Sequence, residues 1–176
     1  MKFMEAYPSV QKELRAVLKA NFPITPSVNQ ILDADIPYLS GTCEEIFRMA
    51  GTAKGIMREA TVDTEILGYK IPKGAEVLFN VHINRAPLPV DESKHSPTVQ
   101  FGKHGHCFSG AAGRDLSSFQ PTRWLFKDEE TGQEKFDAYA LPSLAFGGGY
   151  RGCFGRWHSS ELCSWLCARS GFIVYD

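Results

Sequence analysis

The chain has 176 residues, of which 43% are hydrophobic and 22% are charged. This is the composition of an ordinary globular protein, and the length suits one domain. The formal net charge of −1 excludes the basic field that nucleic acid or anionic lipid would require, so no nucleic-acid partner is expected. No apolar run approaches the roughly 18 residues of a membrane helix, and nothing near the N-terminus resembles a signal peptide.

Two amphipathic helices are expected in the first third of the chain. Residues 8–21 begin with a proline, which suits the first helical position, and carry apolar residues at helical spacing. A loop should follow, up to Asp35, which can cap a second helix that runs from Pro37 to about Met49. Gly51 can end this helix.

The second helix has an apolar stripe and a pair of opposite charges. The stripe consists of Leu39, Cys43, Ile46, Phe47 and Ala50. Glu45 and Arg48 lie on the other side, three residues apart, so their side chains can touch. Taken from this helix alone, they are a solvated surface ion pair.

The middle of the chain predicts a β-hairpin followed by a long loop. Residues 65–70 and 76–81 are the expected strands, and Ile71-Pro72-Lys73-Gly74 suits a type I turn. Residues 84–116 show no period and read as loop. The histidines and cysteine in this segment, at positions 95, 104, 106 and 107, have no second pair of zinc ligands and are interpreted as solvated loop residues.

The five cysteines, at positions 43, 107, 153, 163 and 167, form an odd and unpatterned set. They argue against a disulfide framework and for a reducing compartment. Cys153 stands in the glycine-rich stretch 146–155, which fits the pattern Phe-x-x-Gly-x-Arg-x-Cys-x-Gly at every fixed position. A glycine-rich turn around a buried free cysteine is the simple alternative.

The same stretch also satisfies the dinucleotide-binding pattern through Gly147, Gly149 and Gly152. That pattern needs a preceding strand, a following helix and an acidic residue about 20 positions further on. Only the short segment 141–145 precedes the glycines and the chain ends at Asp176, so we reject a nucleotide loop.

The stretch 146–155 resembles the haem-binding loop of the cytochrome P450 family. The resemblance implies that Cys153 is the axial ligand of a haem b iron, with Phe146, Gly149 and Gly155 at the other fixed positions of the loop. Thiolate ligation favours O–O cleavage over oxygen storage, and glycines supply the backbone freedom of such a loop. Arg151 would pair with a haem propionate.

Three other segments resemble the same family in the same order. Residues 45–48 match its Glu-x-x-Arg signature, residues 68–74 match its Gly-Tyr-x-Ile-Pro-Lys-Gly hairpin, and residues 119–125 match its Phe-x-Pro-x-Arg-Phe/Trp segment. The resemblance implies a buried triad of Glu45, Arg48 and Arg123 that locks the fold and is not catalytic, because buried charges persist only when paired. Arg58 falls where the family often places a second propionate-binding arginine, and a generic exposed arginine remains the alternative.

The family resemblance covers about residues 7–156 and implies a mainly α fold with small β-sheets, the C-terminal part of a cytochrome P450 domain. Residues 1–176 are expected to form one partial domain with a divergent tail over 157–176. We expect the family's membrane anchor and oxygen-activating helix to be missing, so no catalytic residue is assigned. By family, the location is the endoplasmic reticulum membrane. A cytoplasmic location is the alternative, since the sequence shows no membrane helix.

The implied function is that of a monooxygenase, most like fungal enzymes of secondary metabolism. Such an enzyme inserts one atom of O₂ into a small hydrophobic organic substrate, with electrons from an NADPH-dependent reductase. The alternative is an inactive fragment that binds haem weakly or only contacts other chains.

Overall fold

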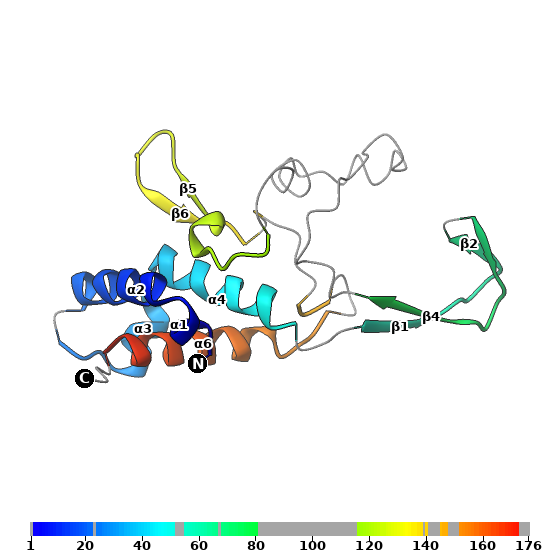
Figure 1. The fold of residues 1–176 in the computed structure, drawn as a ribbon, viewed down its shortest axis with the longest axis horizontal. Coiled ribbons are helices and arrows are strands. Elements are labelled where there is room, and N and C mark those ends of the chain that lie inside the picture. Colours follow the sequence, from blue (N-terminus) through cyan, green and yellow to red (C-terminus); the bar gives the residue numbers. More distant parts are fainter. Residues whose placement is uncertain are drawn as a thin grey trace.

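A computed structural model describes residues 2–22, 24–51, 55–66, 68–80, 116–138, 140, 145–147 and 152–172. The helices gather at one end of the molecule, and a ribbon of β1 and β4 extends away from them (Figure 1). The helical elements are α1 (Lys2–Ala6), α2 (Pro8–Asn21), α3 (Val28–Asp33), α4 (Pro37–Ala50), the 3₁₀ helix η2 (Pro121–Trp124) and α6 (Arg156–Phe172). The strands are β1 (Gly55–Glu59), β2 (Thr64–Ile66), β3 (Tyr69–Ile71), β4 (Glu76–Asn80), β5 (Leu125–Lys127) and β6 (Glu134–Phe136).

The two predicted helices are present as α2 and α4. Helix α2 has the expected bounds and buries Leu14 and Leu18, which lie one turn apart on one face. Helix α4 begins with a proline, as expected, but its N-cap is Ile36, and no side chain caps it. The prediction that Asp35 caps the helix is therefore wrong. Gly51 ends α4 in the left-handed conformation, with φ of 52°, which glycine adopts without strain.

Helix α3 lies inside the segment that the sequence analysis takes as loop. Its N-cap Ser27 accepts a hydrogen bond from the backbone N–H of Gln30, and the Gln30 side chain accepts one from the backbone N–H of Ser27. This is a reciprocal capping box, which satisfies two N–H groups that have no partner within the helix. The Ser-x-x-Gln spacing was visible in the sequence and predicts this helix start.

The segment expected to be a divergent tail forms the longest helix, α6. It packs against α2, α3 and α4 and buries Cys163, Cys167 and Ala168. Its residues therefore belong to the same hydrophobic core as the first helices. Phe119 joins this core from outside the helices, stacking on Phe3 and Tyr7 with ring centroids 5.4 and 5.2 Å apart.

The strands form three separate two-stranded antiparallel sheets: β1 with β4, β2 with β3, and β5 with β6. The predicted hairpin between residues 65–70 and 76–81 is wrong, because its first strand is split into β2 and β3, which pair with each other. The turn is displaced by one residue, since the N–H of Ala75 donates to the carbonyl of Pro72 at 3.1 Å. Gly74 therefore stands third in the turn with φ of 83°, as a type II turn requires.

The fold class, mainly helical with small β-sheets, is confirmed by these elements. Among the described residues, no helix combines the length and the apolar character needed to cross a bilayer. The predicted loop at residues 84–116, with its histidines, lies almost wholly outside the described residues.

Candidate haem-thiolate site

Cys153 lies in the turn that leads into α6. Its backbone N–H donates to the carbonyl of Phe146 at 2.7 Å, and its carbonyl accepts from the N–H of Arg156 at 3.3 Å. These bonds fix the backbone on both sides of the cysteine, while the residue itself is exposed. The sulfur is thus held by ordered backbone and remains open to a ligand.

Other residues of the loop 146–155 surround this cysteine in the sequence. Phe146 is half-buried, and its ring meets that of Phe47 on α4 edge to face, with centroids 4.9 Å apart. Gly147 has φ of 72°, a conformation that glycine tolerates. A Cβ placed on Gly155 would lie 3.6 Å from the sulfur of Cys153, so a side chain there would contact the sulfur. Gly149 and Arg151 lie outside the described residues.

Large apolar side chains beside Cys153 are open to solvent. Phe154, just before α6, is 95% exposed, and Trp157, in the first turn of α6, is 79% exposed. Residues further along the same helix are buried. Large exposed apolar side chains, here close in sequence to an exposed cysteine, often mark a surface that an apolar molecule covers.

The carboxylate of Glu45, buried between α4 and η2, is the centre of the predicted triad with Arg48 and Arg123. Glu45 is 0% exposed. Its oxygens accept from Nε and Nη2 of Arg48, both at 2.8 Å, and from Nε of Arg123 at 3.0 Å. They also accept from Nε1 of Trp124 and from the backbone N–H of Gln120, each at 2.9 Å. The structure therefore brings the three predicted residues together, and a surface ion pair does not describe them.

The two arginines of this network also hold the segment before η2. Arg48 donates to the carbonyl of Leu116 at 2.9 Å, and both arginines donate to the carbonyl of Ser118, at 3.3 and 3.0 Å. Such charge-assisted bonds to backbone fix the path of the chain. The close approach of η2 needs Gly41 on α4, where an added Cβ would lie 2.8 Å from the carbonyl oxygen of Pro121.

Arg58 is placed apart from these groups. It lies exposed in β1, opposite Val77 of β4, and its Nη1 donates to the carbonyl of Met57 at 2.8 Å. The side-chain hydrogen bond of Arg58 is thus made within β1 and does not lead to Cys153.

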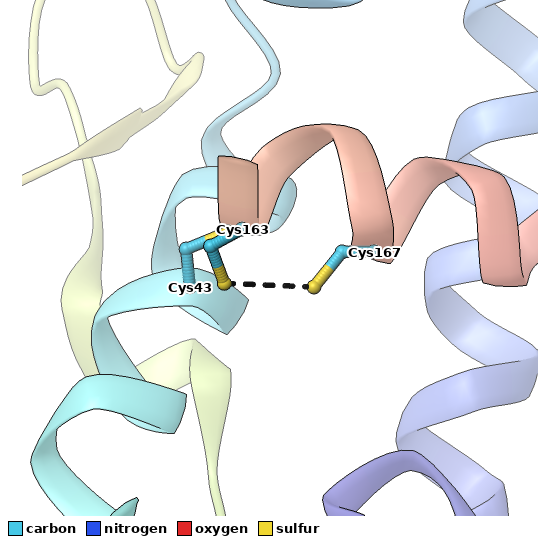
Figure 2. A group of neighbouring side chains, drawn as sticks. All are labelled: Cys43, Cys163 and Cys167. Carbon is cyan, nitrogen blue, oxygen red and sulfur yellow. Dashed lines mark hydrogen bonds between the residues drawn. The ribbon is translucent and has the colours of Figure 1, made fainter. Parts of the chain in front are cut away.

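A second group of cysteines, which the sequence analysis did not recognise, lies away from Cys153. The side chains of Cys43, Cys163 and Cys167 converge between α4 and α6, with their sulfurs all within 4.8 Å of one another (Figure 2). All three are buried free thiols. The four-residue spacing of Cys163 and Cys167 was the available signal, because it places both on one helix face.

The pKa values within this group are displaced by the contacts between the sulfurs. Hydrogen bonding from Cys167 and then Cys43 lowers the pKa of Cys163 to about 4, although its burial opposes the shift. The pKa of Cys167 is raised, first by its hydrogen bond to Cys163.

Comparisons with known proteins point to one family. The family model described as Cytochrome P450 matches residues 1–85. The chain is 41% identical over 178 residues to the cytochrome P450 monooxygenase TRI13 of Fusarium sporotrichioides, covering 89% of this chain and 30% of the relative. It is 37% identical over 164 residues to the cytochrome P450 monooxygenase xilC of Penicillium rubens, covering 89% of this chain and 27% of the relative.

A solved structure gives the same result. The crystal structure of a cytochrome P450, CYP102L1, matches with a TM-score of 0.60 and 25% identity, covering 97% of this chain and 33% of that chain. The helices, the small sheets and the sequence of the chain thus all resemble one class of protein, the cytochrome P450s. The chain is similar to this family over 89% of its length in the two relatives named and over 97% in the solved structure. It spans about 30% of the length of the curated relatives named here.

Similarity to this family implies a haem iron as cofactor, and the residues present fit it. The donor is a thiol sulfur, the haem-iron ligand type of this family. Cys153 offers this sulfur on an exposed turn, with apolar side chains beside it that an aromatic macrocycle would cover. The buried cluster of three cysteines has a different character, because it is enclosed and supplies three sulfurs at one point.

Proposed function

We propose that Cys153 is the axial thiolate ligand of a haem b and that the chain belongs to a monooxygenase. The observation that carries the proposal is the exposed cysteine in a ten-residue loop whose fixed positions all match the family pattern. Relatives that are 41% and 37% identical carry the name cytochrome P450 monooxygenase, which supports the same activity. When bound, a thiolate-ligated haem supplies oxygen activation.

The residues around Cys153 have distinct proposed roles. The backbone bond to Phe146 and the start of α6 hold the sulfur in one place, as groups behind a metal ligand generally do. The absence of a side chain at Gly155 keeps the space beside the sulfur open. Phe154 and Trp157 exclude water from the covered face. Arg151 and Arg58 are proposed to bind propionates, and Gly149 completes the loop.

The buried network has a structural role in this proposal. Glu45, Arg48 and Arg123 fasten the segment 116–124 to α4, and Phe47 of the same helix packs on Phe146 of the cysteine loop. The network therefore supports the helix on which the loop rests. We infer that residues 1–176, including α6, form part of one domain.

The substrate of the proposed reaction is a small hydrophobic organic molecule, and an NADPH-dependent reductase supplies electrons. The name of each relative describes that relative alone, so the substrate class follows here from the family. An assay with labelled O₂ tests the reaction, because a monooxygenase transfers one labelled atom to the product and releases the other as water.

The ligand assignment is tested by the absorption spectrum of the haem-loaded, reduced chain under CO. Thiolate ligation shifts the main band to a characteristically long wavelength. Cys153→Ser is expected to abolish this band, whereas Cys107→Ser should leave it in place. A long-wavelength band that survives Cys153→Ser, or that disappears with Cys107→Ser, would show that another cysteine binds the iron.

A further inference from the structure

Three thiols meet at one point of the interface between α4 and α6. Cys43 comes from α4, while Cys163 and Cys167 come from successive turns of α6, so two rigid helices set their positions (Figure 2). The exposed fractions of the three residues are 4%, 7% and 0%. All three cysteines are therefore shielded from bulk water, and Cys163 is the most exposed of them.

The spacing of the sulfurs matches the requirement of a metal ion. A thiolate–metal bond of about 2.3 Å, the length found for zinc, places three sulfurs around one ion about 4.0 Å apart. The sulfurs of Cys163 and Cys167 are 3.9 Å apart, and no pair in the group exceeds 4.8 Å. Side-chain adjustments of less than about 1 Å would bring all three to bonding distance.

The donor set selects the type of ion. Thiolates favour soft cations such as Cu(I) and also bind zinc. Structural zinc sites are almost always closed by four ligands, and within the described part of the chain this group contains three sulfurs and no histidine or carboxylate. The hydroxyl oxygen of Ser164 lies 3.7 Å from the sulfur of Cys43 and is a weak ligand. Three soft donors in a dry site suit a three-coordinate monovalent cation.

We propose that Cys43, Cys163 and Cys167 form a buried three-sulfur site for a soft monovalent metal ion of the Cu(I) type, separate from the proposed haem ligand Cys153. Two thiolates and one thiol hold the ion, so the site carries one net negative charge. Each thiol that ionises when the ion binds releases its proton to water. The oxidation state of the metal does not change. The ion offsets the cost of placing thiolate charge in the core.

Ordinary core packing is the competing explanation. A free cysteine behaves as a small apolar residue, and the three thiols belong to the hydrophobic cluster that joins α2, α4 and α6. Packing alone explains the burial of three cysteines. It predicts no stoichiometric affinity for a soft cation, and this difference can be measured directly.

The test uses the 176-residue chain with Cys107→Ser and Cys153→Ser, which leaves the three cluster cysteines as the only thiols. Cu(I) is added without oxygen in competition with a colorimetric Cu(I) chelator. We expect one tightly bound ion per chain, thiolate-to-metal absorption in the ultraviolet, and a higher melting temperature. Zn(II) added in equal amount should not displace the ion.

Variants separate a defined site from general thiol chemistry. Adding Cys163→Ser, at the rim of the cluster, should weaken Cu(I) binding at least about 100-fold, because a direct ligand matters more than the groups behind it, which contribute 10- to 100-fold. Cys43→Ser should act alike, and Ser164→Ala should change affinity little. Circular dichroism verifies that each variant is folded. X-ray absorption of the Cys107→Ser, Cys153→Ser chain counts the sulfur atoms bound to copper while the three cluster cysteines remain unchanged.

Three results would overturn the proposal. These are the absence of stoichiometric Cu(I) binding in that chain, affinity that survives loss of Cys163 in a folded variant, and preference for Zn(II) over Cu(I).

Discussion

Removing the carboxylate of Glu45 should destabilise the chain more than any other single truncation of a charged side chain in its described part. Glu45→Ala removes acceptors for Arg48, Arg123 and Trp124 and for the backbone N–H of Gln120. Two guanidinium groups remain in a site where their side chains are 2% and 3% exposed. Removing one partner of a buried ion pair costs about 3–5 kcal/mol, because the remaining charge is stranded.

Urea unfolding of the purified chain measures this loss, with Glu161→Ala as the matched control. Glu161 lies exposed on α6 and should change stability by no more than about 0.5 kcal/mol. The variant with both Glu45→Ala and Arg123→Ala should lose less than the sum of the single losses, since the second change removes a charge that the first has stranded. A loss below about 1 kcal/mol for Glu45→Ala, or additive losses, would refute the reasoning and indicate the energetics of a surface pair.

Three further changes test other features of the fold. Gly41→Ala should lower the free energy of unfolding in urea by about 1–3 kcal/mol, because the added Cβ would contact the carbonyl of Pro121. A gain in stability, which the helix propensity of alanine alone would give, would contradict the close approach. Ser27→Ala should cost about 1 kcal/mol in thermal unfolding by removing the cap of α3, and no change would show that the cap is dispensable. Burial raises the pKa of the Glu44 carboxyl above its usual 4.5, and Arg156 opposes this shift. The folded chain therefore binds the Glu44 proton more tightly than the unfolded chain does. Stability should fall as the pH rises from 4.5 through the pKa of the folded state. Glu44→Gln should flatten this decline in melting temperature, and an equally steep decline would contradict the assignment.

The sequence predicts those parts of the fold that depend on local patterns. Helices α2 and α4 follow from their apolar spacing, their initial prolines and Gly51. The burial of Glu45 and Arg48 could not be predicted from the pattern of α4, since it depends on η2 covering the polar face of the helix. Only the resemblance to a family pointed to the partnership with Arg123.

Long-range pairing explains the errors. The turn at residues 72–75 joins β3 to β4, and local reasoning expects these strands to pair. Instead β4 pairs with β1 over five residues, while β3 pairs with β2 over three, so the longer ladder lies between strands that are farther apart in sequence. Helix α6 was not predicted, because the family resemblance ends near residue 156. Cys163 and Cys167 on its buried face were the local signal.

The network around Glu45 closes a long segment of chain. Glu45 accepts bonds from Gln120, Arg123 and Trp124, which lie 75 to 79 positions further along the chain. The entropy lost on closing a loop grows only with the logarithm of its length, so doubling this segment would cost about 0.6 kcal/mol. That cost is small beside the 3–5 kcal/mol expected for breaking the network. Insertions between α4 and η2 that leave the pairing of β1 to β4 intact should therefore cost the network little stability, provided that the carboxylate and its donors remain at the two ends.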